Sequence, residues 1–176
     1  ETRGRTCFDV VVIGLGPAGL AACHGCRLGG MSVLGIDENS PGGHMLNLTD
    51  VDEYFGVGYD EPISGADVAE NFSNHARHVG AVLMKGKVTH IRIEGMFKQI
   101  QTTQGNFWAR AVIVATGAAQ RELSIDGVTK FINRGIRYGA QVDAAIYKDR
   151  RVIVVGSGDE AMHAAIFLSH HAKNVI

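Results

Sequence analysis

The sequence lacks several features that would assign the protein to a particular class. It has no apolar run near the roughly 20 residues that a membrane-spanning helix needs, and it shows no secretory signal. Its three cysteines are an odd number and too few for a disulfide scaffold, which favours a reducing compartment. Its net charge of −1 gives no argument for binding nucleic acid or a membrane surface. We therefore expect a cytoplasmic globular protein with neither nucleic acid nor membrane among its partners.

Glycine is what the sequence has in excess. The 176 residues include 23 glycines, while 45% hydrophobic and 20% charged residues are ordinary proportions for a globular protein. Glycine is used where the backbone turns sharply or approaches a ligand closely. The positions of the glycines are therefore the first guide to function.

The first group of glycines follows a short apolar run. Phe8–Ile13 is rich in β-branched residues and predicts a strand that is buried on both faces. Gly14, Gly16 and Gly19 come next with G-x-G-x-x-G spacing, and they open a helix that we expect to end near Leu28. In a dinucleotide-binding loop, such glycines allow a tight turn, approach to a pyrophosphate and close helix–strand packing.

A second strand, Ser32–Asp37, ends in an acid at the distance that this motif requires. Asp37 is placed to accept hydrogen bonds from the hydroxyl groups of a ribose. The N-terminus of the preceding helix would offer free N–H groups and its positive dipole end to the phosphates. Strand, glycine loop, helix, strand and acid together predict a dinucleotide-binding half-fold.

The remainder of this half is predicted from local signals. Ser64 and Asp67 resemble a capping box, so we expect a helix from there to about Val79. Residues 118–150 lack clear periodicity and are interpreted as a connection between domains. Short strands around turn signals predict a meander inserted before the return strand of the half-fold; the four strands are Val82–Met84, Lys87–Ile93, Phe97–Thr103 and Phe107–Ala115.

The opening pattern then occurs a second time. Arg151–Val155 predicts a strand, residues 156–161 have the G-x-G-x-x-A variant of the motif, and a helix follows to about His171. The strand that should come next would begin at Asn174, where the sequence stops. We therefore expect the chain to be a truncated part of a longer protein.

With both units placed, the chain resembles the low-molecular-weight thioredoxin reductases and their flavoprotein relatives. The resemblance depends on seven segments in family order: "GLGPAGLAA", "IDENSPGGHM", "LTDVDEYFG", "ISGADVAENFSNHARHVGA", "VIVATGA", "RGIRYGAQVD" and "VIVVGSGDEAMHAAIFLS". It implies an α/β fold with a Rossmann-like FAD-binding domain and a β-meander insert in residues 1–117. Residues 118–176 would be a linker and the incomplete start of a second Rossmann-like domain that binds NADPH or NADH.

The resemblance also implies which residues bind the cofactors, while the spacing of the cysteines and histidines gives no array of metal ligands. The FAD site would comprise the glycine loop, the ribose-binding acids, the loop facing the flavin and the segment closing over the cofactor: Gly14, Gly16, Pro17, Ala18, Asp37, Glu38, Gly42, Gly43, His44, Met45, Thr49, Val88, Ala115, Thr116 and Gly117. The nicotinamide nucleotide would be bound by Gly156, Ser157, Gly158, Asp159, Glu160 and Ala161.

The chain departs from the family pattern in two places near the cofactors. In the loop facing the flavin, His44, Glu53 and Phe55 replace a glutamine, an asparagine and a proline. A carboxylate near a reduced, anionic flavin would disfavour that flavin state unless the carboxylate is protonated or paired. After the second motif, "MHAA" stands where the family usually carries acidic residues, which weakens the expectation of nucleotide binding there.

The largest departure concerns the redox-active dithiol. The family's active-site segment reads tyrosine, C-x-x-C and aspartate, but the matching segment here has Gly139 and Val142 between Tyr138 and Asp143. Without a thiolate, a substrate disulfide cannot be attacked by the family's route. Asp143, the family's proton donor, is the one candidate catalytic residue, and a purely structural role is the more ordinary interpretation.

Cys23 and Cys26 form a C-x-x-C pair elsewhere in the chain. A redox dithiol has its first cysteine at a helix N-terminus, whereas Cys23 would lie about two turns into its helix. A zinc site would need two further ligands at suitable spacing. We therefore predict that both thiols pack the helix against the sheet. His75 and His78, one turn apart, could hold a metal ion, but a solvated helix face accounts for them more simply.

These observations lead to one principal functional hypothesis and two alternatives. The principal one is a homodimeric FAD-dependent oxidoreductase that moves electrons from NADPH or NADH to an external acceptor without an internal dithiol. The acceptor would be a quinone, oxygen, a ferredoxin or flavodoxin, or a small oxidant. The alternatives are a flavin-binding regulatory protein without turnover, and a thioredoxin reductase whose thiols lie beyond Ile176.

Overall fold

The computed structural model describes residues 6–48, 51, 54, 56, 61, 63–118, 123–132, 134–138 and 144–176. Within this part of the chain, no helix combines the length and the apolar character that crossing a membrane requires. The chain divides into two compact units. The first comprises Glu1–Leu46 and Asp50–Ala118, and the second comprises Asn47–Thr49 and Ala119–Ile176.

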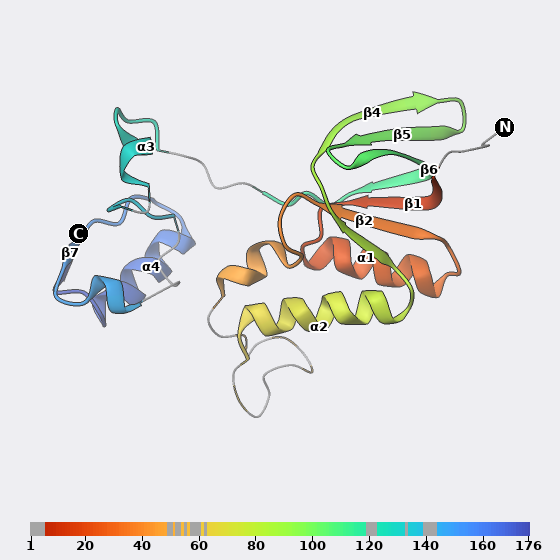
Figure 1. The fold of residues 1–176 in the computed structure, drawn as a ribbon. Coiled ribbons are helices and arrows are strands. Elements are labelled where there is room, and N and C mark those ends of the chain that lie inside the picture. The colour runs from red at the N-terminus through yellow and green to blue at the C-terminus, as the bar shows by residue number, and fades with distance from the viewer. Residues whose placement is uncertain are drawn as a thin grey trace. The chain divides into compact units, whose positions relative to one another are not determined.

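The first unit is built on one twisted sheet with the strand order β3-β2-β1-β6-β5-β4 (Figure 1). β3, β2, β1 and β6 are parallel, and β5 and β4 continue the sheet in antiparallel fashion. The expected α/β fold with a meander insert is confirmed. Its elements are β1 (Cys7–Ile13), α1 (Pro17–Leu28), β2 (Val33–Asp37), the 3₁₀ helix η1 (Gly43–Asn47), α2 (Gly65–His78), β3 (Val82–Lys85), β4 (Val88–Glu94), β5 (Phe97–Thr102) and β6 (Gly105–Val114).

The central strand β1 is buried on both faces because its alternate residues serve two different layers. Val10 and Val12 face helices α1 and α2, where they pack with Leu20, Cys23 and Ala76. The other face carries a second apolar cluster that includes residues of the meander: Val11, Ile13, Leu34, Ile36, Ile100 and Ala109. The helices therefore cover one face of the parallel strands and the meander covers the other, as Figure 1 shows.

One long strand has two roles that the sequence had suggested for separate segments. β6 has ten residues; its first part pairs with β5, and its second part, from Trp108 to Val114, pairs in parallel with β1. The strand that closes the meander is thus the same one that returns to the half-fold.

The predicted helix ends are confirmed. α1 stops at Leu28, before Gly29 and Gly30. Ser64 is the N-cap of α2, and its hydroxyl accepts a hydrogen bond of 3.1 Å from the backbone N–H of Asp67.

Cys23 is a packing residue, as the sequence predicted. It lies in the middle of α1, is fully buried, and belongs to the cluster between α1 and the sheet, while Cys26 packs against that cluster from its edge. Burial, together with the nearby Cys26, raises the pKa of the Cys23 thiol to about 11 from an ordinary 9.0. A redox-active cysteine has the opposite shift, so Cys23 is protonated and unreactive near neutral pH.

We expect thiol-reactive probes to distinguish the three cysteines in the native chain. Cys7 is exposed, Cys26 is half-buried and Cys23 is buried, so alkylation at pH 8 should modify Cys7 first, Cys26 more slowly and Cys23 only after unfolding. Mass spectrometry of timed samples gives the order. Labelling of Cys23 in the folded chain at the rate of Cys7 would contradict the buried, neutral thiol.

The start of β1 is tied to the start of β2 by a polar contact. Asp9 accepts hydrogen bonds from both the hydroxyl (2.7 Å) and the backbone N–H (2.8 Å) of Ser32, and Arg110 lies 3.8 Å from the carboxylate. The side-chain bond from Ser32 is the main reason that the pKa of Asp9 is lowered from its ordinary 3.8. The contact therefore stabilises the fold at pH values above about 3.8, the ordinary pKa of the carboxyl group. This contribution is lost as the pH falls through the lowered pKa of Asp9.

Asp9→Asn should lower the urea midpoint at pH 7, because the amide replaces a hydrogen-bonded carboxylate. The difference in urea midpoint between the variant and the unsubstituted chain should shrink in acid, where Asp9 itself becomes protonated. Urea unfolding at pH 7 and pH 3 measures this, with Asp126→Asn, an exposed acid, as control. An equal deficit at both pH values would show that the charge of Asp9 plays no part.

The second unit differs from one expectation, the length of its first strand. It contains α3 (Val128–Phe131), the 3₁₀ helix η2 (Ala144–Tyr147), β7 (Arg151–Val152), α4 (Asp159–Ser169) and β8 (Asn174–Val175). The segment 118–150, which is interpreted as a connection between domains, contains α3 and η2 among its described residues. β7 was expected to reach Val155; it spans Arg151–Val152 and pairs in parallel with β8, and a 2.8 Å hydrogen bond from the N–H of Val154 to the carbonyl of Ile176 continues this pairing. The beginning of a strand at Asn174 is confirmed.

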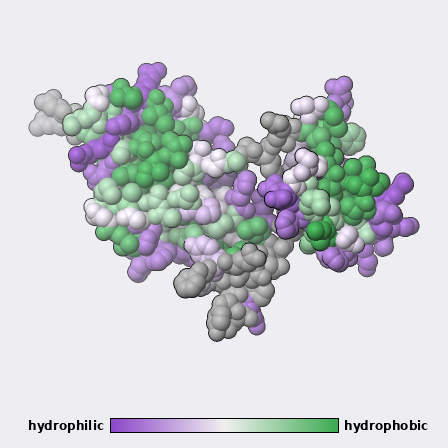
Figure 2. All heavy atoms as spheres, turned by 180° about the vertical axis from the view of Figure 1, so that it is seen from behind, coloured by the Kyte–Doolittle hydropathy of each residue, from purple (hydrophilic) through white to green (hydrophobic). Residues whose placement is uncertain are grey.

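Apolar side chains remain on the surface of both units (Figure 2). In the described part of the second unit, only Val128 and Leu168 are buried apolar residues. The residues around β7 and along α4 are exposed instead; Ile153, Val155, Met162 and Ile166 each expose more than half of their surface. The second unit thus displays apolar surface on both its strand and its helix.

Candidate nucleotide-binding site

The topology of the first unit creates a crevice at the carboxyl end of its parallel strands. The chain moves from β1 to β2 on one side, and β6 lies on the other side of β1. Ligands of open α/β sheets bind where the strand order reverses in this way. The loop after β1 begins at Gly14 and the loop after β6 begins at Ala115, so both of these predicted segments meet at the reversal.

Gly14 is in contact with the loop after β6. Its backbone has φ 93°, a region that favours glycine, and its N–H donates a 2.8 Å hydrogen bond to the carbonyl of Ile36. A Cβ atom at this position would overlap the carbonyl oxygen of Ala115 and lie 2.9 Å from the Cα of Thr116. Only glycine therefore allows the two loops to approach each other at the switch point.

Gly19 allows α1 to approach the strand closely. A Cβ atom here would overlap the carbonyl oxygen of Gly14. The second unit shows the variant arrangement, where Ala161 takes the third position and its Cβ would lie 2.8 Å from a Cβ built on Gly156. The helix of the first unit is therefore packed too tightly for alanine at the corresponding position.

The N-terminus of α1 follows the first glycine loop and has backbone donors without an acceptor in its own helix. Gly16 is the N-cap, with extended backbone angles of −70° and −172°, and Pro17 occupies the first helical position, where no N–H is needed. Helix geometry leaves the next N–H groups, those of Ala18 and Gly19, without an intrahelical acceptor. Together with the helix dipole, these groups form a site suited to a phosphate.

Asp37 links the end of β2 to the glycine loop. One carboxylate oxygen accepts a 2.7 Å hydrogen bond from the N–H of Leu15, and the other accepts a 2.8 Å bond from the N–H of Asn39. The side chain is half-buried, and each carboxylate oxygen retains a further lone pair. Asp37 thus holds the loop in place and keeps acceptor capacity for a ligand hydroxyl.

The loop containing Gly42 and Gly43 lies directly on the first glycine loop. The N–H of Gly42 donates to the carbonyl of Leu15 at 2.7 Å, and a Cβ on Gly43 would lie 3.0 Å from the Cα of Gly16. Both glycines have positive φ angles, 130° and 56°. The loop therefore borders the same crevice and presents His44 and Met45 from η1.

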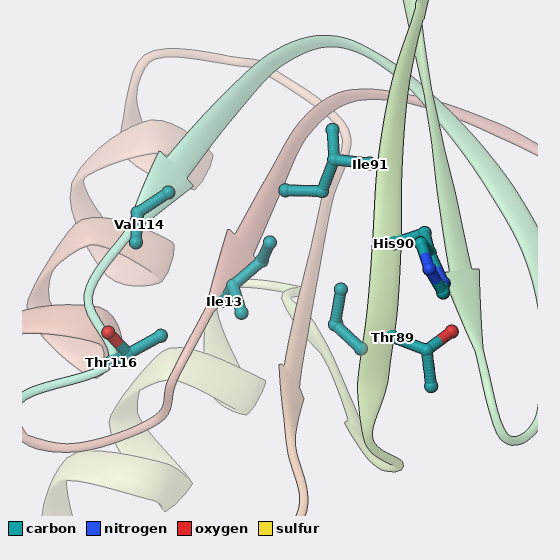
Figure 3. A pocket seen from close by; sticks show the side chains of 7 residues that line it. Ile13, Thr89, His90, Ile91, Val114 and Thr116 are labelled. Carbon is teal, nitrogen blue, oxygen red and sulfur yellow. The ribbon is translucent and has the colours of Figure 1, made fainter. Parts of the chain in front are cut away.

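An open groove of about 360 Å³ continues from the crevice between the ends of β1 and β6 and the start of β4. Its walls are mainly apolar, and Ile13 and Ile91 point toward one another across it (Figure 3). This size and character suit a planar heterocycle. The lining residues are Ile13, Val88, Thr89, His90, Ile91, Val114 and Thr116.

An exposed ion pair lies next to the groove. Lys87, immediately before Val88, is 2.9 Å from the carboxylate of Glu38, immediately after Asp37. Both side chains are more than half exposed, so the pair contributes little to stability. It places one positive and one negative charge beside the groove.

The structure brings together most of the predicted first-unit residues at this one edge of the sheet. Val88 and Thr116 line the groove, and Gly14, Asp37 and Gly43 are joined through the contacts described above. Thr49 lies outside the described residues, as do Glu53, Phe55 and the predicted active-site positions Gly139, Val142 and Asp143.

The six predicted residues of the second unit surround the start of α4. Gly158 is its N-cap, with extended backbone, and its carbonyl accepts a 3.0 Å hydrogen bond from the N–H of Ala161. Asp159 and Glu160 lie in the first turn, where acids interact favourably with the helix dipole. These acids also compete with an anionic ligand for the same helix end.

Sequence reasoning missed two kinds of site residue. Gly35 lies inside β2, and a Cβ there would come within 2.6 Å of Leu15 and 2.9 Å of Cys23, so this glycine makes room for the loop and for α1. An isolated glycine within a strand pattern was the available signal. His90 and Ile91 also line the groove, beside an irregularity in the β4–β5 register between Val88 and His90 that no local signal predicts.

Comparison with known proteins gives consistent matches over almost the whole chain. The pyridine nucleotide-disulphide oxidoreductase family matches residues 8–176. A thioredoxin reductase from Listeria monocytogenes is 34% identical over 168 residues, which are 96% of this chain and 52% of that protein. The crystal structure of Lactococcus lactis thioredoxin reductase in its FR conformation matches with TM-score 0.86 and 33% identity, covering 96% of this chain and 55% of the other.

The thioredoxin reductase from T. acidophilum matches with TM-score 0.83 and 30% identity, covering 97% of this chain and 55% of the other. The chain spans about half the length of the curated relatives that it matches.

Proposed function

The chain belongs to the pyridine nucleotide-disulphide oxidoreductase family, and from this premise we propose that it is the flavin-binding part of an FAD-dependent oxidoreductase that passes electrons from NAD(P)H to an external acceptor. The resemblance to thioredoxin reductases that the sequence suggested is confirmed. Enzymes of this family use FAD and a nicotinamide nucleotide as cofactors. When bound, FAD would accept a hydride from the nicotinamide and release electrons to the acceptor.

The observation that carries the proposal is the contact between Gly14 and Ala115 at the switch point. The contact leaves room for no side chain, and it lies beside a helix N-terminus and a half-buried acid. The N–H groups of Ala18 and Gly19 would hold the pyrophosphate, and Asp37 would accept from the adenosine ribose. The groove that Val88 and Thr116 line would take the adenine.

The other residues that the resemblance assigns to the FAD site are proposed to border the cofactor. They are Gly16, Pro17, Glu38, Gly42, Gly43, His44, Met45, Thr49 and Gly117.

The second unit is proposed as the start of the nicotinamide nucleotide domain, and the first unit as the FAD domain. The backbone of Gly156, Ser157, Gly158, Asp159, Glu160 and Ala161 would bind the pyrophosphate of NADPH or NADH. The glycine loop and the start of α4 support this, because they repeat the arrangement of the first unit.

We propose that electrons leave the flavin without an internal dithiol. Gly139 and Val142 stand where the family's cysteines are expected, and Cys23 is buried with a raised pKa, so it is no substitute. Asp143 would then have a structural role. The acceptor would be a quinone, oxygen, a ferredoxin or flavodoxin, or a small oxidant. We further propose a cytoplasmic homodimer.

Anaerobic reduction of the purified full chain tests this function. NADPH or NADH should bleach the visible absorbance of its bound flavin, and the chain should not reduce thioredoxin. Chemical reduction with dithionite is the control that the flavin is reducible. Bleaching by dithionite but by neither nucleotide would contradict electron transfer and favour a flavin-binding protein without turnover. Reduction of thioredoxin would contradict the absence of a dithiol route.

A further inference from the structure

Helices α1 and α2 lie side by side on the sheet and pack closely (Figure 1). Small side chains make this possible, because Cys23 of α1 and Ala76 of α2 are fully buried in the same cluster. The C-terminal ends of the helices are also tied together, since the Nε of Arg27 donates a 3.0 Å hydrogen bond to the carbonyl of Val79. The distance between the two helices is therefore fixed in the buried cluster and again at their C-terminal ends.

Two histidines meet at the solvent edge of this interface. His24 follows Cys23 in the chain, and His75 precedes Ala76. Their ring centroids are 4.3 Å apart and the ring planes are inclined by 49°. His24 is half-buried and His75 is exposed, so water reaches the pair from one side.

We propose that His24 and His75 together bind a divalent late transition-metal ion, Cu²⁺ or Zn²⁺, that links α1 to α2. Neutral imidazole is the commonest protein ligand for such ions. Because a metal–imidazole bond is about 2.0–2.1 Å long, two adjacent ligands on one ion place their ring centres about 4.5–5.2 Å apart at bond angles of about 90–110°. The observed separation of 4.3 Å is just below this range, so a small rotation of either side chain would allow both rings to bind one ion.

Water would complete the coordination. Among the described residues, no three histidine, cysteine, aspartate or glutamate side chains form a group that could hold a metal ion. A two-ligand site of this kind is open and of moderate affinity, and Cu²⁺ should bind more tightly than Zn²⁺. The nearby Arg27 points its guanidinium at the carbonyls of Val79 and Met31, so it is held by backbone acceptors.

The test is Cu²⁺ binding to the full chain, followed by calorimetry and by electron paramagnetic resonance. His78→Ala is the matched control, because His78 is an exposed histidine one turn along α2 from His75. The chain should show a Cu²⁺ signal with nitrogen coordination that is retained in His78→Ala. Even the loss of an outer-shell partner costs a metal site 10–100-fold in affinity, so loss of a ligand in His24→Ala or His75→Ala should weaken binding by at least about tenfold.

Thermal unfolding provides a second, independent measurement. Added Cu²⁺ should raise the melting temperature of the unsubstituted chain and of His78→Ala, but not of His24→Ala or His75→Ala. Melting in EDTA shows whether each variant is folded, and glutamine replaces alanine where it is not. Cu²⁺ binding and stabilisation that are the same in all variants would overturn the proposal. It would also be overturned if His78→Ala lost as much Cu²⁺ binding and stabilisation as His24→Ala and His75→Ala.

Discussion

Replacing Gly19 with alanine is expected to unfold or severely destabilise the first unit and to abolish its retention of FAD. The added Cβ would overlap the carbonyl oxygen of Gly14, which is backbone and cannot move aside as a flexible side chain would. We expect a loss of at least about 3 kcal/mol in the free energy of unfolding, at the upper end for overpacking. Urea unfolding and the flavin content of the purified chain measure the two effects.

Gly25→Ala is the matched control for this substitution. Gly25 lies in the same helix, and a Cβ built there meets nothing within 4 Å. Since alanine favours a helix over glycine by about 1 kcal/mol, Gly25→Ala should keep its flavin and be as stable as the unsubstituted chain, or more so. If both variants behave alike, the close packing of α1 on the glycine loop is not what positions the site.

Asp37→Ala should weaken FAD binding by roughly 10- to 150-fold. The substitution removes the acceptor for the N–H groups of Leu15 and Asn39 and, in the proposed function, a bond to the ribose. Hydrogen bonds to a charged group contribute about 1.5–3 kcal/mol, which gives this range. Asp37→Asn keeps one acceptor oxygen and should have an intermediate effect. Titration of the flavin-free chain with FAD, followed by flavin fluorescence, measures the affinities.

Glu70→Ala controls for the loss of one negative charge. Glu70 is an exposed residue of α2 that is not assigned to the FAD site, and its removal should leave FAD affinity unchanged. If Asp37→Ala also binds FAD normally, then Asp37 supports neither the loop nor the ribose, and the assignment of the adenosine end of the site is wrong.

The parts of the fold that local signals determine could be predicted from the sequence. β1 and α1 were found because a β-branched run precedes a glycine loop, and α2 because Ser64 caps its N-terminus. Gly14 and Asp37 were identified because their spacing follows from the geometry of strand, turn and helix. Cys23 was assigned to packing because its position within α1 excludes the helix end.

The remaining features depend on contacts between segments distant in the sequence. Ile91 and Val114 line the groove because β4 and β6 meet there, and neither residue has a signal of its own. The pairing of β7 with β8, which hydrogen bonds of Val152 and Val154 with Ile176 continue, also joins segments that are distant in the sequence. His75 was considered with His78 because they are one turn apart, whereas the packing of α1 on α2 places it against His24.

The flavin content of the purified full chain tests the central claim most directly, because every proposed role depends on FAD at the crevice of the first unit. We predict one FAD per chain, lost in Gly19→Ala and retained in Gly25→Ala. A folded chain that neither retains FAD nor takes it up on titration would contradict the assignment of this crevice as a flavin site.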